Sequence, residues 1–140
     1  MSLEAYQKTQ TAAETPSDTE YRLFSQVTRS LIDARDKKAT GIELVQALDW
    51  NRRLWSTLST DCGAAGNKLP ESLRAAIISL SIWVSRYSSE VARRKADIDA
   101  LIDVNRSIME GLAMQREHLR KAAAPPTAPQ SPPPATSTAG

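Results

Sequence analysis

The sequence predicts an all-α protein: a small bundle of three main helices, of which the last is long and heptad-patterned, with a disordered C-terminal tail. Apolar residues recur every three or four positions over most of the chain, no segment alternates as a strand does, and proline or glycine falls between the periodic stretches. A chain of 140 residues suits one domain. We predict an N-terminal segment at 1–15, a helical domain over 16–121 and a tail over 122–140.

The first helix is predicted from Pro16 to Arg35. Thr15 supplies a capping hydroxyl, Pro16 occupies the first helical position, and Asp18 places a carboxylate in the first turn. The apolar stripe consists of Leu23, Val27, Leu31 and Ala34. A polar stretch that ends in Gly41 should close this helix.

The second helix is predicted from Gly41 to Leu58. Its apolar face is built from Leu44, Leu48, Asn51, Trp55 and Leu58 and is broadened by Ile42, Val45, Trp50 and Leu54. The next ten residues, 59–68, are small and polar with two glycines, which predicts a loop that contains Cys62.

The third helix begins at Pro70-Glu71 and carries the longest repeat in the chain. Its stripe follows alternating spacings of four and three and consists of Leu73, Ile77, Leu80, Val84, Tyr87, Val91, Arg94, Ile98, Leu101, Asn105, Ile108 and Leu112. A continuous helix over 71–112 would be roughly 63 Å long at 1.5 Å per residue. The alternative is a break near Ser88-Ser89 or Arg93-Arg94-Lys95 that folds the second half back.

A continuous third helix would leave the second half of its stripe without a partner in the chain. An exposed apolar stripe of this length favours a binding partner. We therefore predict partner-binding residues at Val91, Arg94, Ile98, Leu101, Asn105, Ile108 and Leu112. Asn105 would set the register of the partner helix and Arg94 would meet a carboxylate. The alternative is that these residues pack within the chain or across a homodimer.

The sequence offers no catalytic apparatus and no cofactor or metal site. One Cys and one His exclude multi-cysteine and two-histidine metal sites, and no phosphate-binding glycine motif is present. Cys62 and His118 are expected to be an inert thiol and a solvated side chain. Asp97, Asp99 and Asp103 lack the oxygen-rich loop of a calcium site and form a solvated acidic face. We therefore predict that the protein is not an enzyme.

Location and nucleic-acid binding follow from charge and hydropathy. The most hydrophobic stretch, Ala75–Val84, is bracketed by Arg74 and Arg86 and is too short to span a bilayer, so we expect a cytoplasmic protein with no membrane insertion. The net charge is only +2. Basic clusters at 93–95 and 116–121 lack interleaved aromatic residues, and we expect no direct RNA binding.

Six of the eight prolines lie after Ala124, which predicts a solubilising tail; its PxxP spacings allow a docking motif as the alternative.

Several dispersed blocks resemble the flagellar biosynthesis regulator FlaF of alphaproteobacteria. They occur in order over residues 3–114 and include Ala5-Tyr6, Thr9-Gln10, Glu20–Phe24, Val27-Thr28, Ala47-Leu48, Asn51, Leu54-Trp55, Asn67–Pro70 and Leu101–Leu112. The proline-rich tail lies outside the resemblance.

The resemblance implies a cytoplasmic factor of flagellum biogenesis. Members are described as flagellin-specific secretion chaperones that also affect flagellin synthesis, in partnership with the translational regulator FlbT. Flagellin would add an apolar helix to the stripe of the third helix. Two alternatives stay open: a regulator that acts on flagellin messenger RNA together with FlbT, and a homomeric coiled-coil scaffold.

Overall fold

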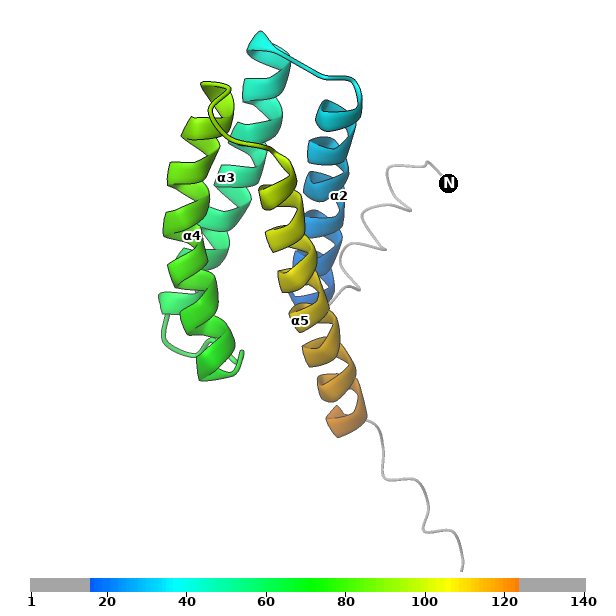
Figure 1. The fold of residues 1–140 in the computed structure, drawn as a ribbon. Coiled ribbons are helices and arrows are strands. Elements are labelled where there is room, and N and C mark those ends of the chain that lie inside the picture. Colours follow the sequence, from blue (N-terminus) through cyan, green and yellow to red (C-terminus); the bar gives the residue numbers. More distant parts are fainter. Residues whose placement is uncertain (1–15, 124–140) are drawn as a thin grey trace, which may run out of the picture.

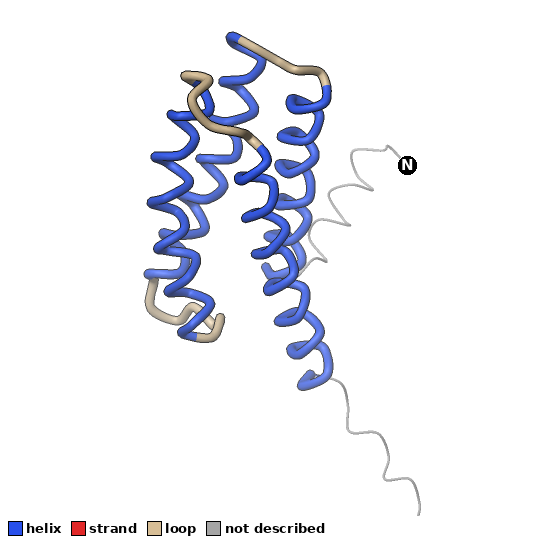
Figure 2. Tube along the Cα trace, in the orientation of Figure 1, coloured by secondary structure: helices blue, strands red, loops and turns tan. Residues whose placement is uncertain are grey.

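The computed structural model describes residues 16–123, which form a four-helix bundle (Figure 1). The helices are α2 (Pro16–Asp36), α3 (Gly41–Gly63), α4 (Glu71–Ala92) and α5 (Asp99–Ala123). Each runs antiparallel to the one before it, and three short connections join them (Figure 2). The chain thus has an up-down-up-down order in which α2 packs against α3 and α5, and α4 packs mainly against α3.

The prediction of three main helices is wrong, because the predicted third helix is two helices. The described residues are helical with no strand among them, as expected, and α2 and α3 begin at the predicted Pro16 and Gly41. The break falls at residues 93–98, near one of the two places where the sequence allowed it. The predicted segment 1–15 lies outside the described residues. So does the predicted tail, apart from its first two residues, which belong to α5.

The break is made by a Schellman turn in which an arginine takes the place usually held by glycine. Arg94 has a φ of 63°, in the left-handed region. The Lys95 amide donates to the Glu90 carbonyl at 2.9 Å, and the Arg94 amide donates to the Val91 carbonyl at 2.9 Å. These two bonds satisfy the last carbonyls of α4 and reverse the chain, although no glycine or proline signals the turn.

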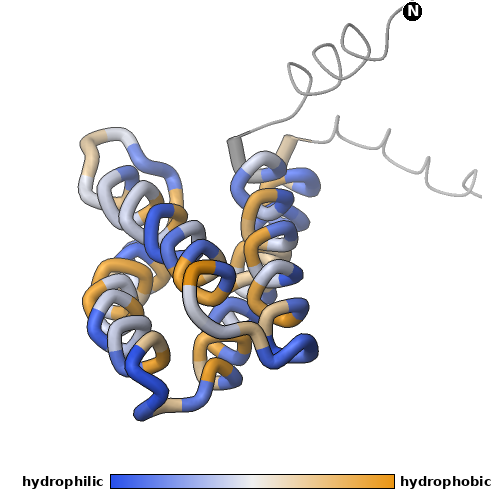
Figure 3. Tube along the Cα trace, turned by 90° about the horizontal axis from the view of Figure 1, so that it is seen from above, coloured by the Kyte–Doolittle hydropathy of each residue, from blue (hydrophilic) through white to orange (hydrophobic). Residues whose placement is uncertain are grey.

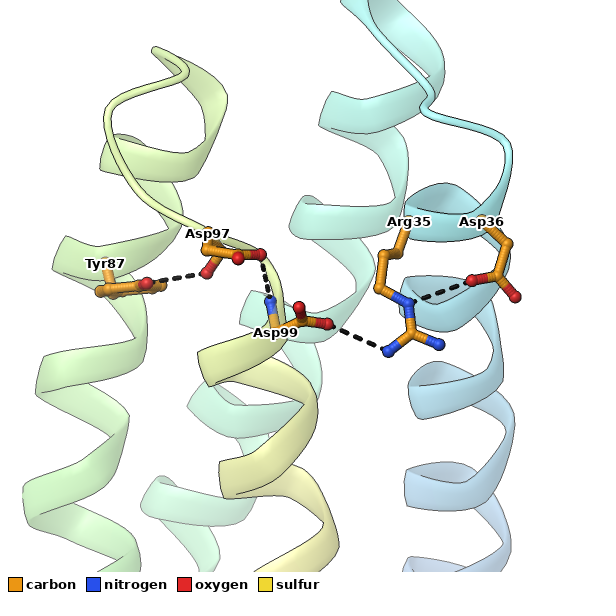
Figure 4. A network of polar contacts seen from close by, with 5 residues as sticks. All are labelled: Arg35, Asp36, Tyr87, Asp97 and Asp99. Carbon is orange, nitrogen blue, oxygen red and sulfur yellow. Dashed lines mark hydrogen bonds and ion pairs between the residues drawn. The ribbon is translucent and has the colours of Figure 1, made fainter.

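Polar contacts then hold the chain between α4 and α5 (Figure 4). The Tyr87 hydroxyl donates to the Asp97 carbonyl at 2.7 Å. The Asp97 carboxylate accepts from the Asp99 amide at 3.0 Å, which caps the start of α5. Arg35 of α2 donates to Asp99 at 3.0 Å and also to its neighbour Asp36. The turn is therefore tied to α4 on one side and to α2 on the other.

The apolar stripes of all four helices meet in one core (Figure 3). Phe24 and Trp55 form its aromatic centre, with ring centroids 5.4 Å apart and planes nearly perpendicular. Ile77 and Val84 of α4 and Leu101 and Leu112 of α5 are fully buried around them. Both halves of the long heptad stripe thus face the interior of the same bundle.

Helix α3 is longer than predicted, and its buried face is narrower, although all five residues of the predicted stripe are buried. It continues five residues past Leu58 to Gly63, so that Cys62 lies in its last turn and is buried. Ile42, Val45 and Trp50, which were expected to broaden the buried face, are exposed, and Leu54 is half-buried. The apolar positions of α3 span more of its circumference than two neighbouring helices can cover.

Candidate partner-binding surface

The stripe predicted to bind a partner lies inside the bundle. Leu101, Asn105 and Leu112 have no exposed surface, and Val91, Ile98 and Ile108 are also buried. Arg94 is exposed at the turn between α4 and α5. The expectation that this stripe has no partner within the chain is wrong, because the break folds α5 back onto α2. Binding of another protein by these residues stays a prediction that would require the bundle to open.

Asn105 is the centre of a buried polar network that joins three helices. Its side-chain oxygen accepts from the Trp55 indole nitrogen at 2.8 Å. Its amide nitrogen donates to the Asn51 side-chain oxygen at 2.8 Å and to the Thr28 hydroxyl at 3.1 Å. All four residues are buried, with at most 5% of their surface exposed. Asn105 therefore joins α2, α3 and α5 of its own chain, while its role in setting the register of a partner helix stays a prediction.

The outer face of α3 carries the large apolar side chains that the core leaves out. We call this surface the α3 face; it consists of Ile42, Val45 and Trp50, which are 77%, 50% and 43% exposed. Asp49 and Arg53 form an ion pair on the same side of the helix, with 2.9 Å between the carboxylate oxygen and Nε. An exposed tryptophan with apolar neighbours and charged residues around it is typical of protein-binding surfaces.

A shallow groove runs beside Trp50, between α2 and α3. Its volume is about 450 Å³, and its lining consists of Gln26, Arg29, Ser30, Asp33, Ala34, Lys37, Glu43, Gln46, Ala47 and Trp50. The floor includes the small side chains of Ala34 and Ala47, while polar and charged residues form the walls. The groove and the α3 face together offer a concave polar strip beside an apolar ridge, which suits an amphipathic helix.

A second hollow, of about 640 Å³, lies at the opposite end of the bundle. It is lined by Asp18 and Glu20 of α2, by residues 66–69 of the loop and by the last turns of α5. Arg116 closes one side, because it donates to Asp18 at 2.6 Å and lies 4.7 Å from the centre of the Tyr21 ring. Burial raises the pKa of Glu20, and the nearby Asp61 raises it further.

The predicted chemical roles of the individual polar residues can be compared with their positions. Cys62 is buried, and that burial, together with Glu20 and Asp61, raises the pKa of its thiol, which favours the unreactive form. His118 is exposed on α5. Asp97 and Asp99 serve the turn before α5, and within residues 16–123 no group of histidine, cysteine and acidic side chains could hold a metal ion.

Three of the six arginine and lysine side chains in the basic clusters at 93–95 and 116–121 form ion pairs. Arg93 pairs with Glu90, Arg116 with Asp18 and Arg120 with Glu117. In the described part of the chain, no helix combines the length and the apolar composition that crossing a bilayer requires.

Comparison with known proteins and protein families bears on the identity of the chain. No curated protein and no solved structure is similar to the chain. The model of one protein family, described as flagellar protein FlaF, matches residues 2–112. The match spans α2, α3 and α4, includes the turn at Arg94, and ends within α5. The chain therefore belongs to the FlaF family of flagellar proteins.

Proposed function

We propose that this protein is a non-catalytic factor of flagellum biogenesis that binds flagellin as a secretion chaperone in the cytoplasm and thereby supports flagellin synthesis and export. The observation that carries the proposal is the α3 face, an exposed apolar ridge beside a groove, inside the part of the chain that the family model matches. The terminal segments of flagellin are apolar helices that have no partner before they enter the filament. Before it is exported, such a helix needs a complementary apolar surface that shields it from water.

The α3 face suits this role better than the hollow at the other end of the bundle. The part of that hollow contributed by α5, from Arg116 to Ala123, lies beyond the residues that the family model matches. The groove and the α3 face lie entirely within 26–50. A property shared by the family is therefore better supported at the α3 face.

Replacing Trp50 with alanine tests the proposal. We expect the variant to bind purified, unassembled flagellin at least tenfold more weakly in isothermal titration calorimetry, because a tryptophan at the centre of an interface often contributes more than 1 kcal/mol. Since Trp50 is 43% exposed, its loss should leave the fold and its thermal unfolding nearly unchanged.

Met114→Ala is the matched control. Met114 is 74% exposed on α5, outside the matched region, so its replacement should leave flagellin binding intact. Unchanged binding by Trp50→Ala, with the wild-type circular dichroism spectrum, would show that flagellin is held elsewhere. A salt-sensitive gel shift of the flagellin messenger leader, with no binding of flagellin, would favour the alternative of an RNA regulator that acts with FlbT.

A further inference from the structure

The hollow between the start of α2, the loop at 66–69 and the last turns of α5 has the size of a binding site, with a volume of about 640 Å³. Leu69 and Leu119 supply large apolar side chains to its lining. Leu119 is 39% exposed and does not belong to the core. The last turns of α5 extend beyond the ends of α2, α3 and α4 (Figure 1). Leu119 therefore has room for an apolar partner that those three helices do not supply.

Residues 1–15 join the bundle beside this hollow. Helix α2 begins at Pro16, and two residues later Asp18 accepts a hydrogen bond from Arg116 of α5 at 2.6 Å. Arg116 precedes Leu119 by three residues, about 4.5 Å along the axis of α5. The chain that precedes Pro16 is therefore attached about one helical turn from the exposed leucine.

Two segments outside the described residues are attached at this end of the bundle, and their compositions differ. The tail at 124–140 follows Ala123, which lines the hollow, but it contains only Ala, Pro, Thr, Ser, Gln and Gly. Residues 1–15 contain Leu3 and Tyr6, as well as charged side chains of both signs. The family model matches all but the first of these residues and none of the tail. Of the two segments, residues 1–15 have the large apolar side chains that the hollow would bury.

We propose that residues 1–15 fold back over the hollow of their own chain and bury Leu3 and Tyr6 against the apolar part of its lining. A spacing of three places these two side chains on the same side of a helical turn, so both would face the hollow. The last turns of α5 would gain an apolar neighbour, and the segment would leave water for a surface to which it is already tethered. The proposal does not depend on flagellin binding.

The length and the direction of the connection allow this fold-back. A residue that precedes a proline disfavours the helical conformation, so the sequence favours a change of direction at Thr15 over a continuation of α2. The ten residues from Tyr6 to Pro16 span about 15 Å as a helix and at most about 36 Å when extended. Either length exceeds the single turn of α5 that separates the contact of Arg116 from Leu119.

Hydrogen exchange of the full chain tests the proposal. In the double variant Leu3→Ser/Tyr6→Ser, the amides of 116–123 should exchange at least fivefold faster than in the wild type, because the last turns of α5 lose the segment that covers them. The double variant Gln7→Ser/Gln10→Ser, in the same segment, is the matched control and should leave these rates unchanged. The amides of α3 should keep their rates in both variants, which shows that the bundle stays folded.

A nitroxide spin label on Lys68→Cys, in the loop that lines the hollow, shows where the segment lies. The label should reduce the amide signals of Leu3 and Tyr6 at least twofold, and Leu3→Ser/Tyr6→Ser should restore them, since a segment held only by its tether would not respond to these side chains. Cys62 is buried and should not take the label. A label on Ile42→Cys, near the start of α3 at the other end of the bundle, is the control and should leave these signals unchanged.

Four results would overturn the proposal. The first is unchanged exchange at 116–123 in Leu3→Ser/Tyr6→Ser, and the second is attenuation that survives this double variant. The third is attenuation that appears only as the concentration rises from 20 to 400 μM, because the segment would then occupy the hollow of a second copy. The fourth is loss of flagellin binding by the double variant with unchanged exchange, because the segment would then hold flagellin. Weaker flagellin binding by Trp50→Ala bears only on the α3 face.

Discussion

At the scale of single residues, Glu20 lies in an unfavourable position for a negative charge. It is half-buried near the start of α2, beside the hollow and close to Asp61. Burial is the main cause that raises the pKa of its carboxyl above the ordinary 4.5, and the charge of Asp61 is the second cause. The folded protein therefore binds the Glu20 proton more tightly than the unfolded chain does.

This shift predicts how Glu20 affects stability as the pH changes. A carboxyl whose pKa is raised by folding stabilises the protein below pH 4.5, and this contribution is lost as the pH rises through the folded-state pKa. Glu20→Gln should therefore raise the free energy of unfolding at pH 7, and the gain should shrink as the pH is lowered toward 4.5. Urea denaturation at several pH values measures this. The same change at Glu110, which is exposed on α5, is the matched control and should leave the free energy of unfolding at pH 7 nearly unchanged.

At the scale of helices, the turn at Arg94 decides the architecture. A continuous helix and a broken one share the same spacing of apolar residues, so the heptad stripe fits both. The difference lies in the backbone of Arg94, which takes the left-handed conformation at a cost of about 1 kcal/mol for a residue with a Cβ. The two hydrogen bonds of the turn and the burial of Ile98 and Leu101 offset this cost.

Arg94→Gly distinguishes the two architectures by the sign of its effect. At a left-handed position glycine removes the Cβ clash, so the variant should be more stable than the wild type by roughly 0.5 kcal/mol, after the extra entropy of glycine in the unfolded chain is counted. In the middle of a continuous helix the same change would destabilise by about 1 kcal/mol. Thermal unfolding followed by circular dichroism shows whether Arg94→Gly raises or lowers the stability. Arg93→Gly, at the preceding position, is the control and shows whether the gain in stability is specific to residue 94.

At the scale of the whole molecule, the Asn105 network specifies which helices meet. Apolar contacts tolerate small shifts between helices, whereas the three hydrogen bonds that Asn105 makes to the other buried side chains form in one arrangement only. Trp55 and Asn51 of α3, Thr28 of α2 and Asn105 of α5 meet at a single point in the core. All four lie within the blocks on which the resemblance to FlaF rests.

Loss of Asn105 should therefore cost more than the volume of its side chain suggests. Asn105→Ala leaves the Trp55 indole N–H and the Asn51 carbonyl oxygen buried without their partner, at about 1–3 kcal/mol for each group. We expect the free energy of unfolding in guanidinium chloride to fall by about 3 kcal/mol. Asp103→Ala, at an exposed position on the same helix, should change it by less than about 0.5 kcal/mol. Similar values for the two variants would mean that the network adds nothing.

Much of the fold could be predicted from local signals, and the candidate surface could not. The helix starts at Pro16, Gly41 and Glu71 follow from proline, glycine and capping residues, which act within a turn or two of the chain. The α3 face was missed because Ile42, Val45 and Trp50 continue the apolar pattern of α3. Hydrophobicity alone does not show which side of a wide apolar face its neighbours cover.

The sequence by itself determined that the chain is helical, where most of its helices begin, and that its longest apolar stripe keeps one heptad register from Leu73 to Leu112. Those properties depend on contacts between residues close together in the chain. Only the tertiary structure decided that the stripe is divided at Arg94 and buried against α2 and α3, and that the α3 face remains exposed. Burial depends on which helices distant in the sequence pack together. The free energy gained by that packing offsets the strain of the left-handed backbone at Arg94, and no glycine or proline in the sequence of the turn predicts that conformation.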